Sequence, residues 1–409
     1  MIAMAPAAQQ RRIIIRRSPR AWARENLFGS AGNTLLTVVS LAVVAFMAYG
    51  VLRFVFVTAD WSVVEANRRL FFLGRFPADE TWRVWIILYV VSAIGGVSVG
   101  AYARIPWQAA IGLALLMVPV LLFIQGGQVA LLTLVALALF AAGYGVARLP
   151  AAAAYVAQQR GWLPVVWVAA VLFALWLLSA VPTLVWGGLM LSMTLTVVGI
   201  AAAFPLGLLL AIGRASTLPV VRWLSITYIE VIRGVPLITI LFMATYLLPL
   251  VLRPERDLAL GIIDLPITGY NPNLVVRAFI AITLFSAAYL AETIRGGLQA
   301  VPRGQMEAAQ ALGLGTTRTL AFIVLPQALR AVVPAIVGQF ISLFKDTSLV
   351  AIVGLTDLLG VARQVTAQQE FIGRQAETLL FVAAIYWMVA FSMSRASQRL
   401  EKTLGIGER

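Results

Sequence analysis

Long apolar runs recur along almost the whole chain, and polar connections that carry arginine separate them. A helix needs about 20 consecutive apolar residues to cross the hydrocarbon core of a bilayer, and many of these runs reach that length. The pattern therefore predicts an all-α polytopic membrane protein with about ten transmembrane helices. The predicted spans are residues 34–57, 83–102, 107–124, 129–147, 163–182, 187–212, 234–252, 273–293, 327–355 and 375–394.

The composition narrows the chemistry that this chain can perform. Of its 409 residues, 61% are hydrophobic and 12% are charged, whereas roughly a quarter of the residues in a soluble domain are charged. The sequence has no Cys and no His, which excludes Cys/His metal sites, thiolate nucleophiles and imidazole catalysis. Its two lysines, Lys345 and Lys402, do not follow a glycine, so there is no Gly-Lys-Ser/Thr loop for ATP. We therefore expect no catalytic residue, no metal site and no bound cofactor.

The net charge of +14 indicates how the chain is oriented. Segment 1–33 carries six arginines, and basic segments tend to stay on the cytoplasmic side. An even number of spans then places both termini in the cytoplasm. Anionic lipid headgroups explain a basic tail beside a membrane more simply than nucleic acid does. The apolar run that follows this tail is also too long for a twin-arginine export signal. Basic residues of the connections predicted to be cytoplasmic are Arg104, Arg148, Arg160, Arg214, Arg222, Arg233, Arg295, Arg303, Arg318, Arg395, Arg399 and Lys402.

A break near Pro182 and Gly188 divides the chain into two halves. The second half holds most of the polar, patterned connections, and the longest of them is residues 292–326. The predicted parts are a basic cytoplasmic tail at 1–33, accessory transmembrane helices at 34–183 and a transmembrane core at 184–409, with about five helices in each membrane part.

The long connection has the pattern of two short helices that meet at a glycine. Pro302 suits the first turn of a helix, and Gly313 stands where a left-handed residue would end it. Thr316 or Thr317 is suited to cap a second helix that runs toward Ile323. Small side chains on the first helix allow another protein to approach closely, and Glu307 can accept hydrogen bonds from it. These small residues are Ala308, Ala309 and Ala311.

The spacing of this connection resembles a known signature. Glu307-Ala308-Ala309, Gly313, Ile323 and Leu325-Pro326 match every position of the EAA motif of bacterial ABC importer permeases. The similarity covers roughly residues 184–400 and is greatest to permeases for polar amino acids. The N-terminal half looks like the extension of the larger permease subunit in general L-amino-acid transporters. Further segments that carry the resemblance begin at Thr194, Tyr228, Ser286 and Gln339.

The resemblance implies a type I ABC importer permease that moves amino acids across a bacterial inner membrane. In that family the EAA loop forms coupling helices, so Glu307, Ala308, Ala309 and Gly313 are expected to dock an ATP-binding subunit. Two such subunits would bind ATP and magnesium. A periplasmic amino-acid-binding protein would deliver substrate, and the permease partner would be a second copy of this chain or a related subunit.

Two charged residues interrupt the apolar run after Ala331, namely Lys345 and Asp346. Charged side chains within the membrane usually face a cavity or a partner. Adjacent residues on a helix point in different directions. Either side chain is a candidate contact for an amino-acid zwitterion or a subunit interface. The alternative is that the span breaks here and both charges lie at the outer interface. Ser286 and Tyr289 are further candidates for lining the path.

Three other charged residues have simpler interpretations. Glu292 and Arg295 fit a surface ion pair on one helix. Arg233 precedes Gly234-Val235-Pro236, where the family usually has Thr in place of Val235. Its simplest role is to extend toward lipid headgroups, with Pro236 in the first turn of the next helix.

An ion-coupled secondary transporter is the main alternative function. Such proteins have matching broken helices in two halves and acidic residues within the membrane. The two halves of this chain are not visibly related, and acidic residues are scarce in the apolar runs. An intramembrane Ser/Lys enzyme would have to pair Ser342 or Ser348 with Lys345, which no other feature supports.

Overall fold

The computed structural model describes residues 18–102, 127–149, 158, 160–251, 258–260, 263–265 and 272–403. The chain divides into two compact units, Met1–Asp60 and Trp61–Arg409.

The first unit contains one membrane-length helix. α1 (Pro19–Asn26) is capped by the Ser18 hydroxyl, which accepts from Ala21 N at 3.3 Å. α2 (Ala31–Arg53) is capped in the same way by Ser30, and it continues as the π-helical segment η1 (Phe54–Thr58). Together α2 and η1 form a 28-residue apolar span. The first predicted span is therefore confirmed, with ends a few residues beyond those predicted.

The second unit begins with two short helices, α3 (Ser62–Ala66) and α4 (Arg68–Leu73). Three apolar helices follow, α5 (Thr81–Tyr102), α8 (Gly127–Val146) and α10 (Leu163–Ser179). α5 packs against both α8 and α10, and α10 also touches the C-terminal half. The N-terminal helices of this unit therefore form part of the same compact body as the helices that follow.

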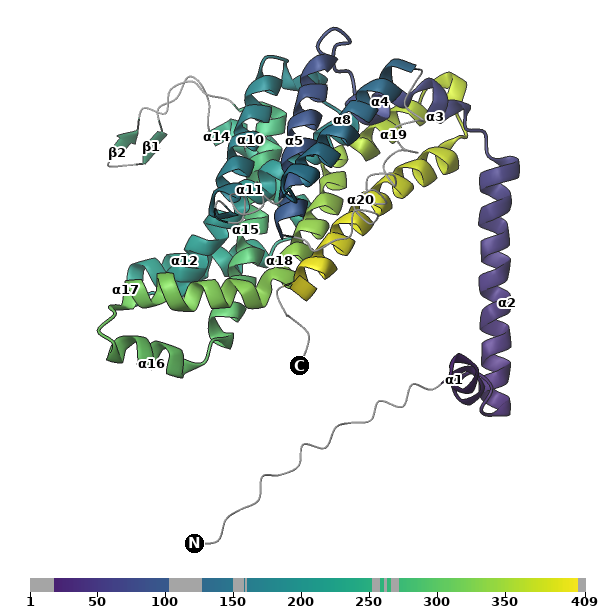
Figure 1. Ribbon diagram of the computed structural model, residues 1–409. Helices are drawn as coiled ribbons and strands as arrows, with labels where there is room; N and C mark the ends of the chain where they lie inside the picture. The colour runs from purple at the N-terminus through teal and green to yellow at the C-terminus, as the bar shows by residue number, and fades with distance from the viewer. Residues whose placement is uncertain are drawn as a thin grey trace. The chain divides into compact units, whose positions relative to one another are not determined.

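The C-terminal half is a helical bundle, shown from teal to yellow in Figure 1. Its central helices are α11 (Gly188–Arg214), α15 (Leu274–Ala300), α18 (Leu325–Asp346) and α20 (Gln375–Thr403). A two-stranded hairpin pairs β1 (Leu258–Leu260) with β2 (Ile263–Leu265), and no other strand occurs in the described segments. The remaining elements are α12 (Pro219–Arg233), α13 (Leu237–Phe242), η4 (Met243–Leu247), α14 (Leu248–Val251), α16 (Arg303–Ala311), α17 (Thr316–Thr319), η5 (Leu320–Val324), η6 (Thr347–Val353), α19 (Leu358–Thr366) and η7 (Gln369–Phe371).

The prediction of a polytopic helical membrane protein is confirmed. Within the described residues, seven helices are long and apolar enough to cross a membrane. The pair Pro219–Arg233 and Leu237–Leu250, bent by 103°, counts as an eighth if it forms one span, and α10 is a shorter apolar helix. Nine predicted spans overlap these helices, and the remaining one, 107–124, lies outside the described residues. The seven long helices are Ala31–Thr58, Thr81–Ala101, Val129–Val146, Gly188–Arg214, Leu274–Ala300, Thr316–Val353 and Gln375–Gln398.

Glycine allows the central helices to approach closely. A Cβ atom on Gly207 of α11 would lie 2.8 Å from the Leu290 Cβ on α15. A Cβ atom on Gly297 of α15 would lie 2.6 Å from the carbonyl oxygen of Ala328 on α18. Both distances are too short for a real side chain, so these two crossings depend on the absence of one. α15 is thereby held between α11 and α18, with which it makes extensive contacts.

The long connection is more helical than its pattern indicated. α15 continues to Ala300 and a helix resumes at Thr316, so these helices extend beyond the apolar runs predicted as spans. α15 ends where it does because Val301 precedes Pro302 and takes an extended conformation, as the residue before proline usually does. Only two short breaks, residues 301–302 and 312–315, interrupt the helices of this connection.

Candidate functional site

The first candidate site is α16, which stands at one end of the bundle, opposite α19 (Figure 1). It begins directly after Pro302 and ends at a turn centred on Gly313. Gly313 has φ 81°, a left-handed conformation that favours glycine, and Leu314 N donates to the Ala309 carbonyl at 3.1 Å. The left-handed residue predicted at Gly313, at the end of the first helix, is therefore confirmed.

Three of the four predicted docking residues are exposed. Glu307, Ala308 and Gly313 lie at the surface, but Ala309 is only 2% exposed and lies on the face that packs toward η5. Because its side chain is buried within this chain, Ala309 adds no exposed surface to α16. The sequence did not single out Leu312, which follows α16 and is 82% exposed.

The second predicted coupling helix is not a separate element. Gly315 occupies the N-cap position and makes no side-chain cap, so neither Thr316 nor Thr317 caps the helix as predicted. The helix that begins at Thr316 runs on through η5 into α18. The loop is therefore joined to the bundle through α18 as well as through α15.

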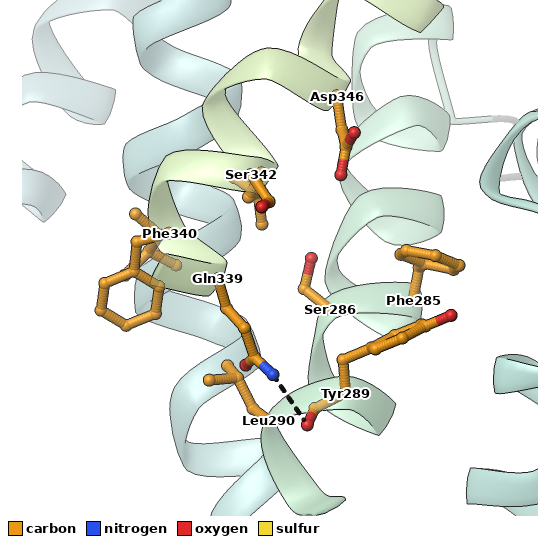
Figure 2. A pocket seen from close by; sticks show the side chains of 10 residues that line it. Phe285, Ser286, Tyr289, Leu290, Gln339, Phe340, Ser342 and Asp346 are labelled. Carbon is orange, nitrogen blue, oxygen red and sulfur yellow. Dashed lines mark hydrogen bonds between the residues drawn. The ribbon is translucent and has the colours of Figure 1, made fainter. Parts of the chain in front are cut away.

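The second candidate site is a cavity of about 370 Å³ between α15 and α18. Figure 2 shows Ser286 and Tyr289 on α15, across from Gln339, Ser342 and Asp346 on α18. On α18 the polar residues are separated by three and four positions, which places them on one face of the helix. The complete lining is Ile200, Phe285, Ser286, Tyr289, Leu290, Gln339, Phe340, Ser342, Leu343 and Asp346.

Gln339 joins the two walls of this cavity. Its Nε2 donates to the backbone carbonyl of Tyr289 at 3.1 Å, drawn as the dashed line in Figure 2, and to Thr293 Oγ1 at 2.5 Å. Thr293 Oγ1 itself donates to the same carbonyl at 3.1 Å. The sequence did not indicate that Gln339 lines a cavity, since a lone glutamine in an apolar run gives no sign of what it faces.

The side chains of Lys345 and Asp346, the two charged residues that interrupt the apolar run, lie in different surroundings. Asp346 lines the cavity together with Ser286 and Tyr289, whereas Lys345 is exposed and does not belong to the lining. This agrees with the expectation that the two side chains point in different directions. α18 ends at Asp346 and continues as the 3₁₀ segment η6, so the helix type changes at these two charges.

Glu292 lies at the centre of an ion cluster that sequence reasoning missed. Arg295 pairs with it on the same helix, as predicted. Arg214 at the end of α11 lies 3.3 Å from Glu292 Oε2, and Arg233 at the end of α12 lies 3.9 Å away. Arg214 also donates to Glu230 at 2.8 Å. The Arg233 guanidinium stands 5.4 Å from the centre of the Tyr289 ring, so it faces inward and does not extend toward lipid.

Asp357 is a second polar residue that the sequence analysis did not identify. It is fully buried and caps α19, accepting from Gly360 N at 2.9 Å, Leu359 N at 3.2 Å and the Tyr386 hydroxyl at 3.1 Å. Burial raises its pKa to about 6, although these hydrogen bonds oppose the shift. An Asp directly before an apolar, helix-forming segment was the signal that would have revealed this cap.

Comparison with known proteins places the chain in a family. Residues 203–405 match the family described as "Binding-protein-dependent transport system inner membrane component". The chain is 37% identical to the inner membrane amino-acid ABC transporter permease protein YhdY of Escherichia coli (strain K12), over 94% of this chain and 93% of that protein. It is 36% identical, over the same shares, to the glutamate/glutamine/aspartate/asparagine transport system permease protein BztC of Rhodobacter capsulatus.

Shorter relatives match only about half of the chain. The probable glutamine ABC transporter permease protein GlnP of Bacillus subtilis is 36% identical over 53% of this chain and 91% of its own length. One solved structure, of an amino acid ABC transporter with histidines, is 27% identical over 53% of this chain and 91% of that chain, with a TM-score of 0.45. The two relatives that match over nearly their full length decide the assignment. The chain belongs to the binding-protein-dependent transport system inner membrane components and is a multi-pass permease subunit of the amino-acid ABC importer group.

Proposed function

We propose that this permease moves amino acids into the cytoplasm with energy from ATP and magnesium bound by two separate ATP-binding subunits. The observation that carries the proposal is the geometry of α16, an exposed helix at the end of the bundle that ends in a left-handed glycine. α16 lies between two helices of the membrane region, so a subunit docked on it can move both. Glu307, Ala308, Gly313 and the exposed Leu312 form the proposed contact.

The proposed orientation places α16 in the cytoplasm and α19 at the outer face. α20 runs back toward the α16 end of the bundle (Figure 1), which supports a cytoplasmic C-terminus. Arginines concentrate near the inner ends, including Arg214, Arg233 and Arg295, as expected for cytoplasmic connections. The six arginines of segment 1–33 support a cytoplasmic N-terminus by the same rule. The proposed location is a bacterial inner membrane.

The proposed partners are a second permease core and a periplasmic amino-acid-binding protein. Relatives named BztB and BztC are both permease proteins of a glutamate/glutamine/aspartate/asparagine transport system, and both are similar to this chain. Two different permeases with one system name support a heteromeric pair here, although a second copy of this chain is the other arrangement. We assign to residues 34–183 the role of accessory helices and to residues 184–409 that of the transport core.

The cavity between α15 and α18 is the proposed substrate path. Its volume lies within the range of small-ligand sites. Asp346 offers a carboxylate for an ammonium group, and the hydroxyls of Ser286, Ser342 and Tyr289 offer donors and acceptors for the rest of a zwitterion. The proposed substrates are therefore polar amino acids. Lys345, which is exposed beside the cavity, is assigned a contact with the paired core.

Substitutions on α16 test the docking proposal. Proline cannot adopt the φ of Gly313, so Gly313→Pro must rebuild the end of α16. Glu307→Lys reverses the charge of an exposed docking residue. We expect either change to abolish ATP-driven uptake and to weaken co-purification of the ATP-binding subunit. The amount of permease in the membrane should not change.

Gly304→Ala is the matched control for these variants. Gly304 lies within α16, and a methyl group added there meets no neighbouring atom. Alanine also favours a helix, so uptake should be retained. If the Gly313 or Glu307 variant transports as well as the unmodified protein, α16 does not transmit the energy of ATP hydrolysis.

A further inference from the structure

The ion cluster around Glu292 connects three helices at one level of the bundle. The Glu292 side chain on α15 is 21% exposed and lies between arginines at the C-terminal ends of α11 and α12. Arg214 contacts both Glu292 and Glu230, so it bridges α11 to α15 and to α12. Because these charges are partly withdrawn from water, loss of one partner leaves the others poorly compensated.

The position of the cluster along α15 is informative. Tyr289, which lines the cavity, lies one helical turn before Glu292. After Glu292 the helix continues to Ala300, and only Val301 and Pro302 separate it from α16. Glu292 therefore lies on α15 between Tyr289, which belongs to the cavity wall, and the end of the helix that leads into α16.

Arg233 extends the cluster to the cavity wall. Its guanidinium lies over the Tyr289 ring at 5.4 Å and at 3.9 Å from Glu292 Oε2, a longer contact than that of Arg214. Arg233 is the last residue of α12, immediately before the 103° bend that leads into α13. A displacement of α12 would therefore act on Tyr289 through this side chain.

A second contact holds the same helices independently of the cluster. The Tyr228 hydroxyl on α12 donates to the carbonyl of Leu284 on α15 at 2.8 Å. α11 and α12 also approach closely, since a Cβ on Gly213 would lie 2.3 Å from Ser225 Oγ. The helices should therefore remain packed when the ion cluster is removed. Such a cluster adds rigidity between helices that packing already brings together.

We propose that Glu292 is a positioning residue that clamps the inner ends of α11 and α12 to α15, so that a displacement of α16 moves these three helices together. This inference rests on the proposed function, because it assumes that an ATP-binding subunit displaces α16. Without the clamp, α15 would move while α11 and α12 lag behind. ATP hydrolysis would continue, but fewer substrate molecules would be carried for each ATP consumed.

The test compares cross-helix and same-helix pairs in the complete importer reconstituted in proteoliposomes. Glu292→Gln and Arg214→Gln remove contacts between helices, whereas Arg295→Gln removes the hydrogen bond to Glu292 within α15 and leaves the Arg214 and Arg233 contacts of Glu292 in place. We expect the amount of amino acid transported per ATP hydrolysed to fall several-fold in the first two variants, at equal amounts of assembled complex. Arg295→Gln should keep the ratio of the unmodified protein, and Glu292→Asp should restore part of it. An unchanged ratio in Glu292→Gln and Arg214→Gln, or an equal fall in Arg295→Gln, would overturn the proposal.

A spectroscopic measurement tests the clamp separately from transport. The chain has no cysteine, so spin labels attach only at introduced sites. Labels at Val231→Cys on α12 and Gln299→Cys on α15, both exposed positions, report the distance between the two inner ends. We expect a narrow distance distribution that broadens in Glu292→Gln, and an unchanged distribution would overturn the clamp. If the unmodified importer shows no ATP-driven uptake, the proposed function fails, whereas this distance measurement still tests the cluster.

Discussion

Gln339 Nε2 donates to the backbone carbonyl of Tyr289 at 3.1 Å and thereby ties α18 to α15 beside the cavity. A partly buried side-chain hydrogen bond of this kind contributes about 1 kcal/mol to stability. The same glutamine also donates to Thr293, so one side chain holds two groups of the facing helix. The shape of the cavity therefore depends on a polar contact in surroundings that are otherwise largely apolar.

Replacement of Gln339 by leucine should lower the stability of the permease. The variant loses both hydrogen bonds and leaves the Thr293 hydroxyl with fewer partners, at a cost of roughly 1–3 kcal/mol. Thermal unfolding of the purified protein in detergent measures the loss. Gln327→Leu is the control, because Gln327 is exposed and bonds only within its own helix. Equal melting temperatures for the two variants would contradict this role of Gln339.

Asp346→Asn should weaken transport of amino acids. The carboxylate lines the cavity and can attract an ammonium group, whereas the amide carries no charge. We expect kcat/KM for uptake to fall roughly tenfold, which corresponds to about 1.4 kcal/mol. The neighbouring Lys345→Gln variant changes a side chain outside the cavity lining, so its KM should stay near that of the unmodified protein. The assignment of the cavity fails if Asp346→Asn leaves kcat/KM unchanged.

Two adjacent glycines of α15 should respond in opposite ways to alanine. A Cβ on Gly297 would lie 2.6 Å from the Ala328 carbonyl oxygen, so Gly297→Ala must separate α15 from α18, at a cost of about 1–3 kcal/mol. A Cβ on Gly296 meets no atom within 4 Å, so Gly296→Ala should stabilise the helix by roughly 0.5–1 kcal/mol. Thermal unfolding of both variants in one detergent gives the comparison. A stabilised Gly297→Ala variant would show that the two helices do not pack as described.

Asp357 should make stability depend on pH between about 4 and 6. Its pKa rises from an ordinary value of 3.8 to about 6 in the folded protein, so the folded state binds a proton more tightly than the unfolded state. Stability should therefore increase as the pH falls from 7 to 5, by roughly 1 kcal/mol from this group, out of about 3 kcal/mol for the complete shift. Asp357→Asn removes the titrating carboxyl group. As the pH falls from 7 to 5, the melting temperature of the unmodified protein should therefore rise relative to that of the variant. A difference that is constant from pH 7 to 5 would contradict the raised pKa.

The sequence predicted the helical class and most spans because apolar length is a direct physical requirement for crossing a bilayer. It also predicted the left-handed turn at Gly313, since glycine after a helix-forming segment has a specific backbone meaning. The ends of α15 and α18 were missed because polar residues beyond the apolar run remain helical outside the bilayer core. Hydropathy marks the membrane boundary and not the end of the helix.

The ion cluster around Glu292 could be identified only from the structure. Arg214, Arg233 and Glu292 lie far apart in the sequence, and only the packing of α11, α12 and α15 brings them together. The burial of Ala309 was missed for a related reason, since the pattern of a single helix does not show which face meets a neighbour. By contrast, the pair of Glu292 with Arg295 was predicted, because its spacing of three residues is local to one helix.

ATP-driven uptake into proteoliposomes tests the central claim most directly. The permease is reconstituted with its second core, its ATP-binding subunits and the binding protein, and a labelled polar amino acid is added on the side of the binding protein. We predict accumulation that requires ATP on the opposite side, persists when ion gradients are collapsed, and is lost in Gly313→Pro but kept in Gly304→Ala. Accumulation that continues without ATP while an ion gradient is maintained would contradict the account and favour a secondary transporter.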